Sequence, residues 1–364
     1  MKIKEICKVL EDIAPASFAE DWDNVGLLVG DAEASTDRLM LCIDLSEEVI
    51  AEARQAKAGM LMCYHPPIFK PLSRVTADAC PLVFKALKSN IAIYSMHTSF
   101  DVVPGGSNDV LARAMGLKKA QPIEDYCGQS LVKIAVYTPP DELSRVANAA
   151  FAAGAGRLGN YYDCAFFSHG IGTFCPNPKA RPTVGSADKH EAVEEVKLEF
   201  IAPLALAGHV CSALRETHSY EEPAIDVVPM RQFPKGTGMG RIGRLERPVR
   251  LSTLLTKVKK ATGVSHLLLA GAAKKDIKIS TVACGAGSCG SLYKKALANG
   301  AEFYLTGEMR HHDALAASKM VVACVGHSNS ERLSLDDLAK RLTMMLKGLK
   351  TQVSRRDHDP FVIS

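Results

Sequence analysis

The stretch that decides the fold is RLMLCIDLSEEVIAEARQAKAGMLMCYHPP, residues 38–67. It begins with a short apolar run, residues 38–46, which is typical of a buried strand. Residues 47–58 follow with apolar positions at helical spacing, and residues 59–64, GMLMCY, form a second apolar run. A strand, a helix and a strand in this order predict a βαβ unit, and therefore an α/β layer architecture.

The same alternation continues on both sides of a different middle section. We predict a helix at 81–90, a strand at 90–98 and a helix at 108–117 that ends at Gly116. Strands at 264–271, 277–285, 301–308 and 320–327 alternate with helices at 291–300, 311–319 and 331–349. These segments predict one α/β domain that is discontinuous in sequence.

The middle section has the pattern of an α+β unit. Its segments have the patterns of a strand, a helix, hairpin strands broken by Gly and Pro, a further strand and a second helix. This order over about 105 residues suits a compact ferredoxin-like domain. We therefore predict residues 1–127 and 236–364 as the two parts of the main domain and residues 128–235 as the insertion.

The composition indicates a cytosolic protein without a membrane partner. No run approaches the roughly 18 apolar residues of a spanning helix, and residues 1–15 have the pattern of an amphipathic helix rather than a secretion signal. The net charge of +4 over 364 residues neither demands nor excludes an acidic partner. Local basic groups favour a solvated surface over nucleic-acid contacts.

The cysteines argue against a zinc finger or a disulfide scaffold. There are eleven, an odd number, and none forms a C-x-x-C pair. Most lie in apolar runs, where cysteine behaves as a small buried hydrophobe.

Polar side chains follow three of the predicted strands. Tyr64 and His65 follow the first, His97 and Asp101 lie at the end of the second, and His327 and Glu331 are at the end of the third. Ligands of α/β sheets collect beyond the carboxyl ends of strands. Imidazoles and carboxylates together are a ligand set for Zn, Mn or Fe.

Each of these residues also has a structural interpretation. Residues 328–331, SNSE, fit a capping box, in which Glu331 would only close a helix N-terminus. His65 precedes two prolines that fix the chain direction, which suits a ligand and a plain turn equally. Asp101 precedes VVPGG and could be a turn former. The residues alone leave both interpretations open.

Two further motifs surround these candidates. Residues 284–290, CGAGSCG, could hold an anion on their amides or could simply form a packing turn. Residues 306–317, TGEMRHHDALAA, contribute Glu308, His311, His312 and Asp313. One of these could support a site or shuttle a proton, or they could be surface residues that open a helix.

In this order the motifs resemble one family over nearly the whole chain. FAEDWDNVGLLVGD, YHPPIF, HTSFDVVPGGSND, TGEMRHHDALAA and GHSNSERL are similar to motifs of the Nif-three-like dinuclear metal-centre family, also labelled GTP cyclohydrolase 1 type 2 homologues. ETHSYEEPAIDVVPM resembles the end of that family's middle domain, which is similar to PII and CutA proteins.

The resemblance implies a two-metal site in the central cavity of a ring-shaped homohexamer built from paired trimers, and we expect one or two divalent ions per subunit. By position, the implied ligands are His65, Asp101, His327 and Glu331. Members commonly carry a second histidine where this chain has Tyr64. A phenol with a pKa near ~10 is a poorer ligand than imidazole. Residues expected around the ligands are Tyr64, His97, His312 and Asp313.

Two functions follow from such a site. The first is a metal-dependent hydrolase acting on a nucleotide or phosphoester, because divalent ions activate water and clamp oxyanions. The second is a non-catalytic metal-binding regulatory or interaction protein, which the PII-like and CutA-like insertion favours. The cyclohydrolase label is inherited from the family, and the sequence identifies no purine pocket. The expected partners are a homohexamer and a small-molecule or nucleotide ligand.

Overall fold

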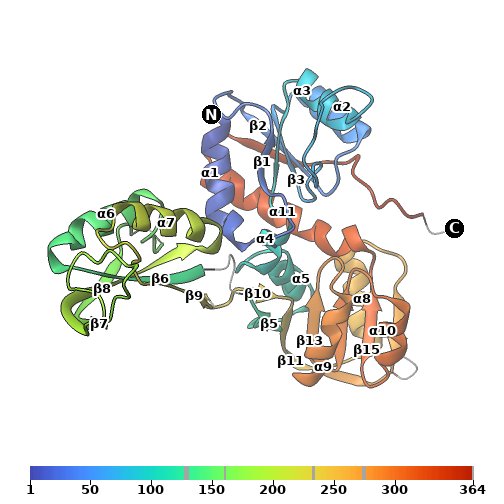
Figure 1. Ribbon diagram of the computed structural model, residues 1–364. Helices are drawn as coiled ribbons and strands as arrows, with labels where there is room; N and C mark the ends of the chain where they lie inside the picture. Colours follow the sequence, from blue (N-terminus) through green and yellow to red (C-terminus); the bar gives the residue numbers. More distant parts are fainter. Residues whose placement is uncertain (127–130, 160, 232–233, 273–275, 363–364) are drawn as a thin grey trace. The chain divides into compact units, whose positions relative to one another are not determined.

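The computed structural model describes residues 1–126, 131–159, 161–231, 234–272 and 276–362 (Figure 1). The chain forms two compact units, of which the first combines Met1–Gly128 with Phe233–Ser364 and the second is Gln129–Gln232. The first predicted domain boundary, between residues 127 and 128, lies outside the described residues.

The first unit contains two five-stranded sheets. The first sheet has the order β1 (Gly26–Val29), β4 (Ala92–Ser95), β3 (Met60–Cys63), β2 (Arg38–Cys42) and β16 (Lys350–Val353). The second has the order β11 (Arg241–Arg250), β13 (Lys278–Gly285), β14 (Phe303–Thr306), β15 (Val321–Cys324) and β12 (Leu268–Gly271). Periodicity identifies strands but does not say which strands pair, so the sequence prediction of one α/β domain left the number of sheets open.

Both sheets have parallel centres. In the first, β2, β3, β4 and β16 run parallel and β1 is antiparallel to β4. In the second, β13, β14 and β15 are parallel, while β11 and β12 are antiparallel edges. The parallel βαβ prediction for residues 38–67 is therefore confirmed, and the carboxyl ends of several strands share one edge of each sheet.

Helices cover both faces of each sheet (Figure 1). On the first sheet, α1 (Ile3–Ile13) and α11 (His327–Met345) pack on one face, and α2 (Glu47–Gln55) and α3 (Pro81–Lys88) pack on the other. On the second sheet, α5 (Ser107–Met115) and α8 (Leu251–Thr262) cover one face, and α9 (Tyr293–Ala298) covers the other.

Helix α1 confirms the amphipathic pattern predicted for the N-terminus, since Ile3, Ile6, Leu10 and Ile13 are buried. Short elements complete the first unit: α4 (His97–Val102), α10 (His311–Ala316), the 3-10 turns η1 (Ala16–Phe18) and η3 (Gly290–Leu292), and the small ladder of β5 (Glu124–Asp125) with β10 (Gly238–Met239). Among the described residues, no helix is both long and apolar enough to cross a membrane.

Helix α11 connects the two sheets. It begins directly after β15 of the second sheet and leads into β16 of the first. Leu335, Leu338 and Leu342 lie in the core of the first sheet, while Leu333 packs against that of the second. The N-terminus of this helix is therefore held by both halves of the unit, which fixes the side chains of its first turns.

The second unit is a four-stranded antiparallel sheet with two helices. The sheet has the order β7 (Ala165–Phe174), β8 (Glu191–Pro203), β6 (Leu131–Thr138) and β9 (Ile225–Met230). After β6 come η2 (Pro140–Glu142) and α6 (Leu143–Ala152), and α7 (Leu204–Thr217) follows β8. Alternate residues of β6 and β8 form a core with α6 and α7, which leaves the other face of the sheet to a separate set of side chains.

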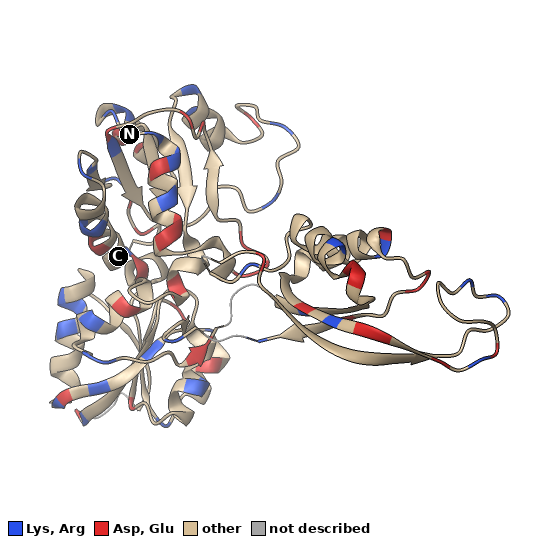
Figure 2. Ribbon diagram, turned by 90° about the vertical axis from the view of Figure 1, so that its left-hand side faces the viewer, with Lys and Arg blue, Asp and Glu red and all other residues tan. Residues whose placement is uncertain are grey.

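Charge is mixed in both units. Acidic and basic residues are interspersed along the elements (Figure 2), and ion pairs such as Lys2–Glu33 and Lys118–Glu246 join exposed side chains.

Candidate metal centre

Three of the four predicted ligands come together at the edge where the two sheets meet. The ligand atoms of His65, His327 and Glu331 all lie within 4.8 Å of one another. His65 follows β3 of the first sheet, and the other two belong to the first turns of α11, which follows β15 of the second. One helical turn separates His327 from Glu331, so both side chains project from the same face.

The ring nitrogens of the two histidines are oriented by carboxylates. His65 Nδ1 lies 2.8 Å from Asp44 Oδ1, and His327 Nδ1 lies 3.0 Å from Glu308 Oε1. In each ring the Nδ1–H is thus donated outward, which leaves Nε2 directed at Glu331. Carboxylates that hold metal-binding imidazoles in this way are typical of protein metal sites.

Glu331 is the central acidic group. Its side chain is only 4% exposed, with Oε1 at 3.3 Å from His327 Nε2 and Oε2 at 3.4 Å from His65 Nε2. Burial opposes ionisation, but interactions with the two histidines outweigh it and lower the pKa of Glu331. Among the described residues, the contact of Oε2 with His65 Nε2 is an ion pair without good hydrogen-bond geometry.

This donor set fits a divalent cation. A buried carboxylate is costly unless a cation offsets its charge. Two imidazole Nε2 atoms and a carboxylate are a ligand set for Zn, Mn or Fe. The residues therefore fit the ion that the sequence predicts.

Without a cation, protons take its place. Burial opposes the charged form of His65, but bonds to Asp44 and Glu331 raise its pKa to about 10. The bond to Glu331 is the main cause that raises the pKa of His327 to about 9, and Glu308 adds to it. The hydrogen bond from His65 in turn lowers the pKa of Asp44. The cluster thus attracts positive charge.

Asp101, the fourth predicted ligand, is not part of this three-residue cluster. The hydroxyls of Tyr64 and Ser107 both donate to its Oδ1 atom. Burial, and then the charge of Glu331, raise the pKa of Asp101 to about 6. Its role as a ligand stays a prediction.

Tyr64 is fully buried, and its hydroxyl is engaged with Asp101. Burial and the charges of Asp101 and Glu331 raise its pKa well above the ordinary value of a phenol. The group therefore stays protonated and donates a hydrogen bond. It supports Asp101, which agrees with the expectation that a phenol is a poor ligand at this position.

His97 lies beside the cluster in an unusual backbone conformation. Its φ of 31° is rare for a residue other than glycine. Its ring centroid is 5.2 Å from that of His65, and its Nδ1 lies 2.8 Å from Asp23 Oδ1. The sequence predicted a strand through residue 98, but α4 begins at His97. Trp22, the only tryptophan, packs edge-on against the His97 ring at 5.7 Å.

His312 and Asp313 lie outside the three-residue cluster. The His312 side chain is exposed and packs against His311, with ring centroids 5.5 Å apart. Asp313 pairs with Lys294 at 3.2 Å. No contact between either residue and the three-residue cluster is found in the part of the chain that the structure describes.

The capping-box interpretation of residues 328–331 is wrong. Helix α11 begins at His327, with Gly326 as its N-cap and no side-chain cap. Glu331 therefore lies one turn inside the helix and not at the position of a capping-box carboxylate. Because the helix starts at His327, one residue before the SNSE motif, Glu331 lies one turn after His327 on the same face and contacts both histidines.

The CGAGSCG segment is a packing turn rather than an anion cradle. The amide of Ala286 donates to Asn108 Oδ1 at 2.9 Å, and that of Gly287 donates to Ser330 Oγ at 2.8 Å. A Cβ at Gly287 would lie 2.4 Å from Glu331 Oε1, and its φ is +63°. Only glycine lets this turn pass so close to the carboxylate.

Sequence reasoning missed Asp23 and Asp44, which orient His97 and His65. Asp44 lies near the end of the strand predicted at 38–46, close to where the identified candidates lie on their strands, so its position was a usable signal. Asp23 lies in a loop before β1, and nothing in the pattern there connects it with His97.

Together the fold and the cluster define an α/β protein with a candidate divalent-metal centre where two sheets meet. The chain belongs to the Duf34/NIF3 (NGG1p interacting factor 3) family, whose profile matches residues 1–360. This confirms the family predicted from the motifs.

Relatives match along nearly the full length. The GTP cyclohydrolase 1 type 2 homolog of Bacillus subtilis is 34% identical, and the match covers 98% of this chain and 97% of that protein. The homolog of Mycobacterium tuberculosis is 32% identical, with 91% and 88% covered. Among solved structures, a Bacillus cereus protein related to NIF3 aligns at a TM-score of 0.66 with 31% identity, covering 100% and 99% of the two chains.

Proposed function

We propose that the protein is a divalent-metal-dependent hydrolase that acts on a nucleotide or another phosphoester. The observation that carries the proposal is the buried Glu331 carboxylate, whose two oxygens each lie close to the Nε2 atom of one histidine, Oε2 at 3.4 Å from His65 and Oε1 at 3.3 Å from His327. Zn, Mn and Fe all suit this donor set. A cation held there would lower the pKa of a water molecule and offset negative charge that develops on the substrate.

The chain's own residues have distinct tasks in this proposal. Asp44 and Glu308 hold the Nδ1 protons of the two histidines, so both Nε2 lone pairs face inward. Asp101 is the candidate for moving a proton, because its pKa of about 6 lets it exchange a proton near neutral pH. Tyr64, which donates to Asp101, would fix the direction of that carboxyl.

Space for a substrate adjoins the cluster. A hollow of about 500 Å³ is lined by Glu308, Ser288, Ser291 and Arg310, among others. Glu308 also bonds His327, so the hollow and the metal centre share a residue. An exposed arginine beside a metal centre suits the phosphate of a nucleotide. The curated relatives' name, GTP cyclohydrolase 1 type 2 homolog, agrees with a nucleotide substrate.

We further propose that one ion binds firmly and that a second, if bound, is weaker. His65, His327 and Glu331 would hold the first. The second would depend on Asp101, one oxygen of which already accepts two hydroxyls. The prediction is close to one ion per chain by elemental analysis after dialysis, and two per chain would refute it.

The test of the hydrolase combines metal content with turnover on one sample. The metal-loaded protein should hydrolyse at least one member of a panel of nucleotides, GTP included, and phosphoesters. His327→Ala should lose both metal and turnover, whereas His312→Ala, an exposed histidine outside the cluster, should keep both. Metal-loaded protein that turns over no member of the panel would instead indicate the non-catalytic regulatory protein.

We also infer that the inserted unit is ferredoxin-like. Support comes from its element order, β6-α6-β7-β8-α7-β9, together with the sheet order β7-β8-β6-β9.

A homohexamer is likewise a proposal for this chain. It is favoured by the exposed Phe166, Phe167 and Ile171 on the edge strand β7, because a long apolar edge is usually covered by another chain. Light scattering should then give six times the chain mass of 39.2 kDa.

A further inference from the structure

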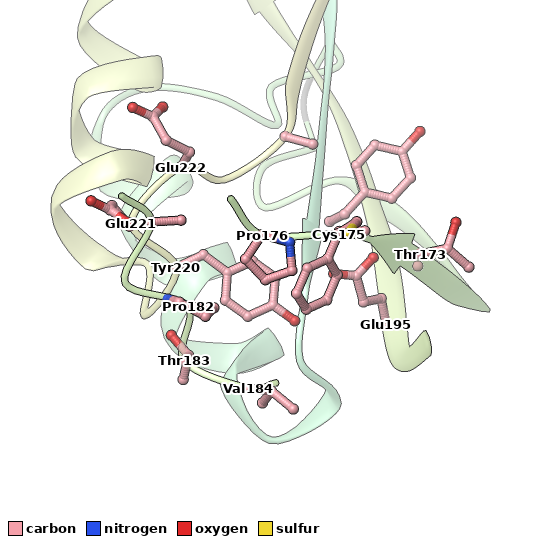
Figure 3. A pocket seen from close by; sticks show the side chains of 15 residues that line it. Thr173, Cys175, Pro176, Pro182, Thr183, Val184, Glu195, Tyr220, Glu221 and Glu222 are labelled. Carbon is pink, nitrogen blue, oxygen red and sulfur yellow. The ribbon is translucent and has the colours of Figure 1, made fainter. Parts of the chain in front are cut away.

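The inserted unit has a cavity of its own, separate from the metal centre. Its volume is about 470 Å³, and every residue that lines it belongs to the second unit. Cavities of this size commonly hold small molecules. Figure 3 shows labelled side chains from β7, β8 and the two adjoining connections around it.

The sheet supplies the floor of this cavity. Val136 of β6 belongs to the core under the helices, and Val196 of β8 is fully buried. Their neighbours Tyr137 and Glu195 therefore face the opposite side, where they line the cavity. Phe174, at the end of β7, adds a second aromatic ring. The alternation of strand residues thus places one carboxylate among aromatic side chains.

The wall opposite the sheet is fastened by hydrogen bonds. Within the segment between β7 and β8, the Arg181 amide donates to Glu221 Oε2 at 2.8 Å. The Thr183 hydroxyl donates to the Ser219 carbonyl at 2.9 Å. These bonds join the segment to the connection between α7 and β9. The cavity therefore has its shape without a ligand, which reduces the ordering cost of binding.

The position of Glu195 depends on a glycine. A Cβ at Gly172 of β7 would lie 2.0 Å from Glu195 Oε2, so the carboxylate occupies the space that a side chain would fill. Burial and the charge of Glu195 raise the pKa of Tyr220, another lining residue, to about 12. Tyr220 therefore remains a neutral phenol beside the carboxylate.

The charges of the lining all have one sign. Glu195, Glu221 and Glu222 line the cavity, and no lysine, arginine or histidine is among the lining residues that the structure describes. Glu221 already accepts the Arg181 amide. Glu195 is hydrogen-bonded by Tyr220, and an ionised carboxylate has acceptor capacity beyond one such bond, so it can still accept from a charged donor.

We propose that this cavity binds a small organic cation, a protonated amine with an apolar body. The ammonium group would lie against Glu195, and the body would pack on the rings of Tyr220 and Phe174 and on Pro182. Carboxylates form their strongest hydrogen bonds with charged donors, and aromatic faces attract ammonium groups. The site is independent of the hydrolase proposed for the metal centre.

The test uses three molecules of similar shape and different charge on the full-length protein. Phenethylamine is the cation, 2-phenylethanol its neutral counterpart and 3-phenylpropionate the anion. Calorimetry at pH 7 should show binding of the amine, at least tenfold weaker binding of the alcohol and none of the acid. The metal-site variant His327→Ala should bind the amine like the unchanged protein, which separates this site from the metal centre.

Two variants and a matched control test the role of the carboxylate. Glu195→Gln keeps the shape and removes the charge, so it should weaken amine binding at least tenfold and leave alcohol binding unchanged. Gly172→Ala should also weaken amine binding, because it displaces the carboxylate. Glu194→Gln, the same change at the neighbouring exposed residue outside the lining, should have no effect.

Three results would overturn the proposal. The first is equal binding of the amine, the alcohol and the acid, which would make the site purely apolar. The second is the absence of amine binding to the unchanged protein at millimolar concentrations. The third is an amine Kd that rises with protein concentration, which would mean that another copy of the chain fills the cavity.

Discussion

Replacing Glu331 by glutamine should abolish tight metal binding while keeping the fold. The substitution keeps the size of the side chain but removes the only charge that contacts both histidines, at 3.3 and 3.4 Å. Loss of a carboxylate that merely orients a ligand typically costs 10- to 100-fold in metal affinity. Loss of a ligand itself should cost at least about 100-fold, or about 2.7 kcal/mol.

The assay is competition with a chromophoric chelator, using Zn²⁺ and Mn²⁺ in separate titrations. The fluorescence of Trp22, which packs against His97, offers a second readout. Asp336→Asn is the matched control, because it removes one negative charge from an exposed position of the same helix. Thermal unfolding of the metal-free proteins should show that the Glu331→Gln protein is folded.

The reasoning is refuted if the Glu331→Gln protein binds metal within threefold of the unchanged protein. It is also refuted if Asp336→Asn weakens binding equally, since general charge rather than coordination would then explain the effect. A folded variant with greatly weakened binding is the only outcome that agrees with the proposed centre.

Three further predictions concern the same region. Gly287→Ala should weaken metal binding at least about tenfold, because its Cβ would displace the Glu331 carboxylate. The control Gly263→Ala has a similar φ of +73° but open space around the Cβ, so it should only lower the stability of the fold, by a strain of about 1 kcal/mol. Equal metal affinity in both variants would contradict this prediction. Since the two ligand imidazoles have pKa values of about 10 and 9 without metal, they bind protons at pH 7, so metal binding should release close to two protons and strengthen as pH rises toward 9. Calorimetry in buffers of different ionisation enthalpy measures this proton release. If no protons are released, the histidines are not ligands. Tyr64→Phe removes a buried donor to Asp101 and should lower the free energy of unfolding by about 1–2 kcal/mol in chemical denaturation; an unchanged value would mean that Ser107 alone satisfies the carboxylate.

The local sequence pattern was sufficient to predict many of the helices and strands and the polar residues at the ends of strands. Residues 38–67 form β2, α2 and β3 because their apolar positions repeat at the spacing of strands and a helix. Gly116 ends α5 in the left-handed conformation, as its place after an apolar helix predicts. His65, His327 and Glu331 were identifiable because polar residues directly after buried strands lie at a sheet edge.

What the sequence determined by itself is the α/β alternation, the family and the short set of side chains able to bind a metal ion, because these depend on residue type and spacing along the chain. The pairing of strands into two sheets was decided only in three dimensions, since strands far apart in sequence compete for the same partners. The meeting of His65 with Glu331 depends on that pairing and on α11, which both sheets hold. The bonds of Tyr64 and Ser107 to Oδ1 of Asp101 likewise depend on the tertiary structure, because they join side chains of different elements.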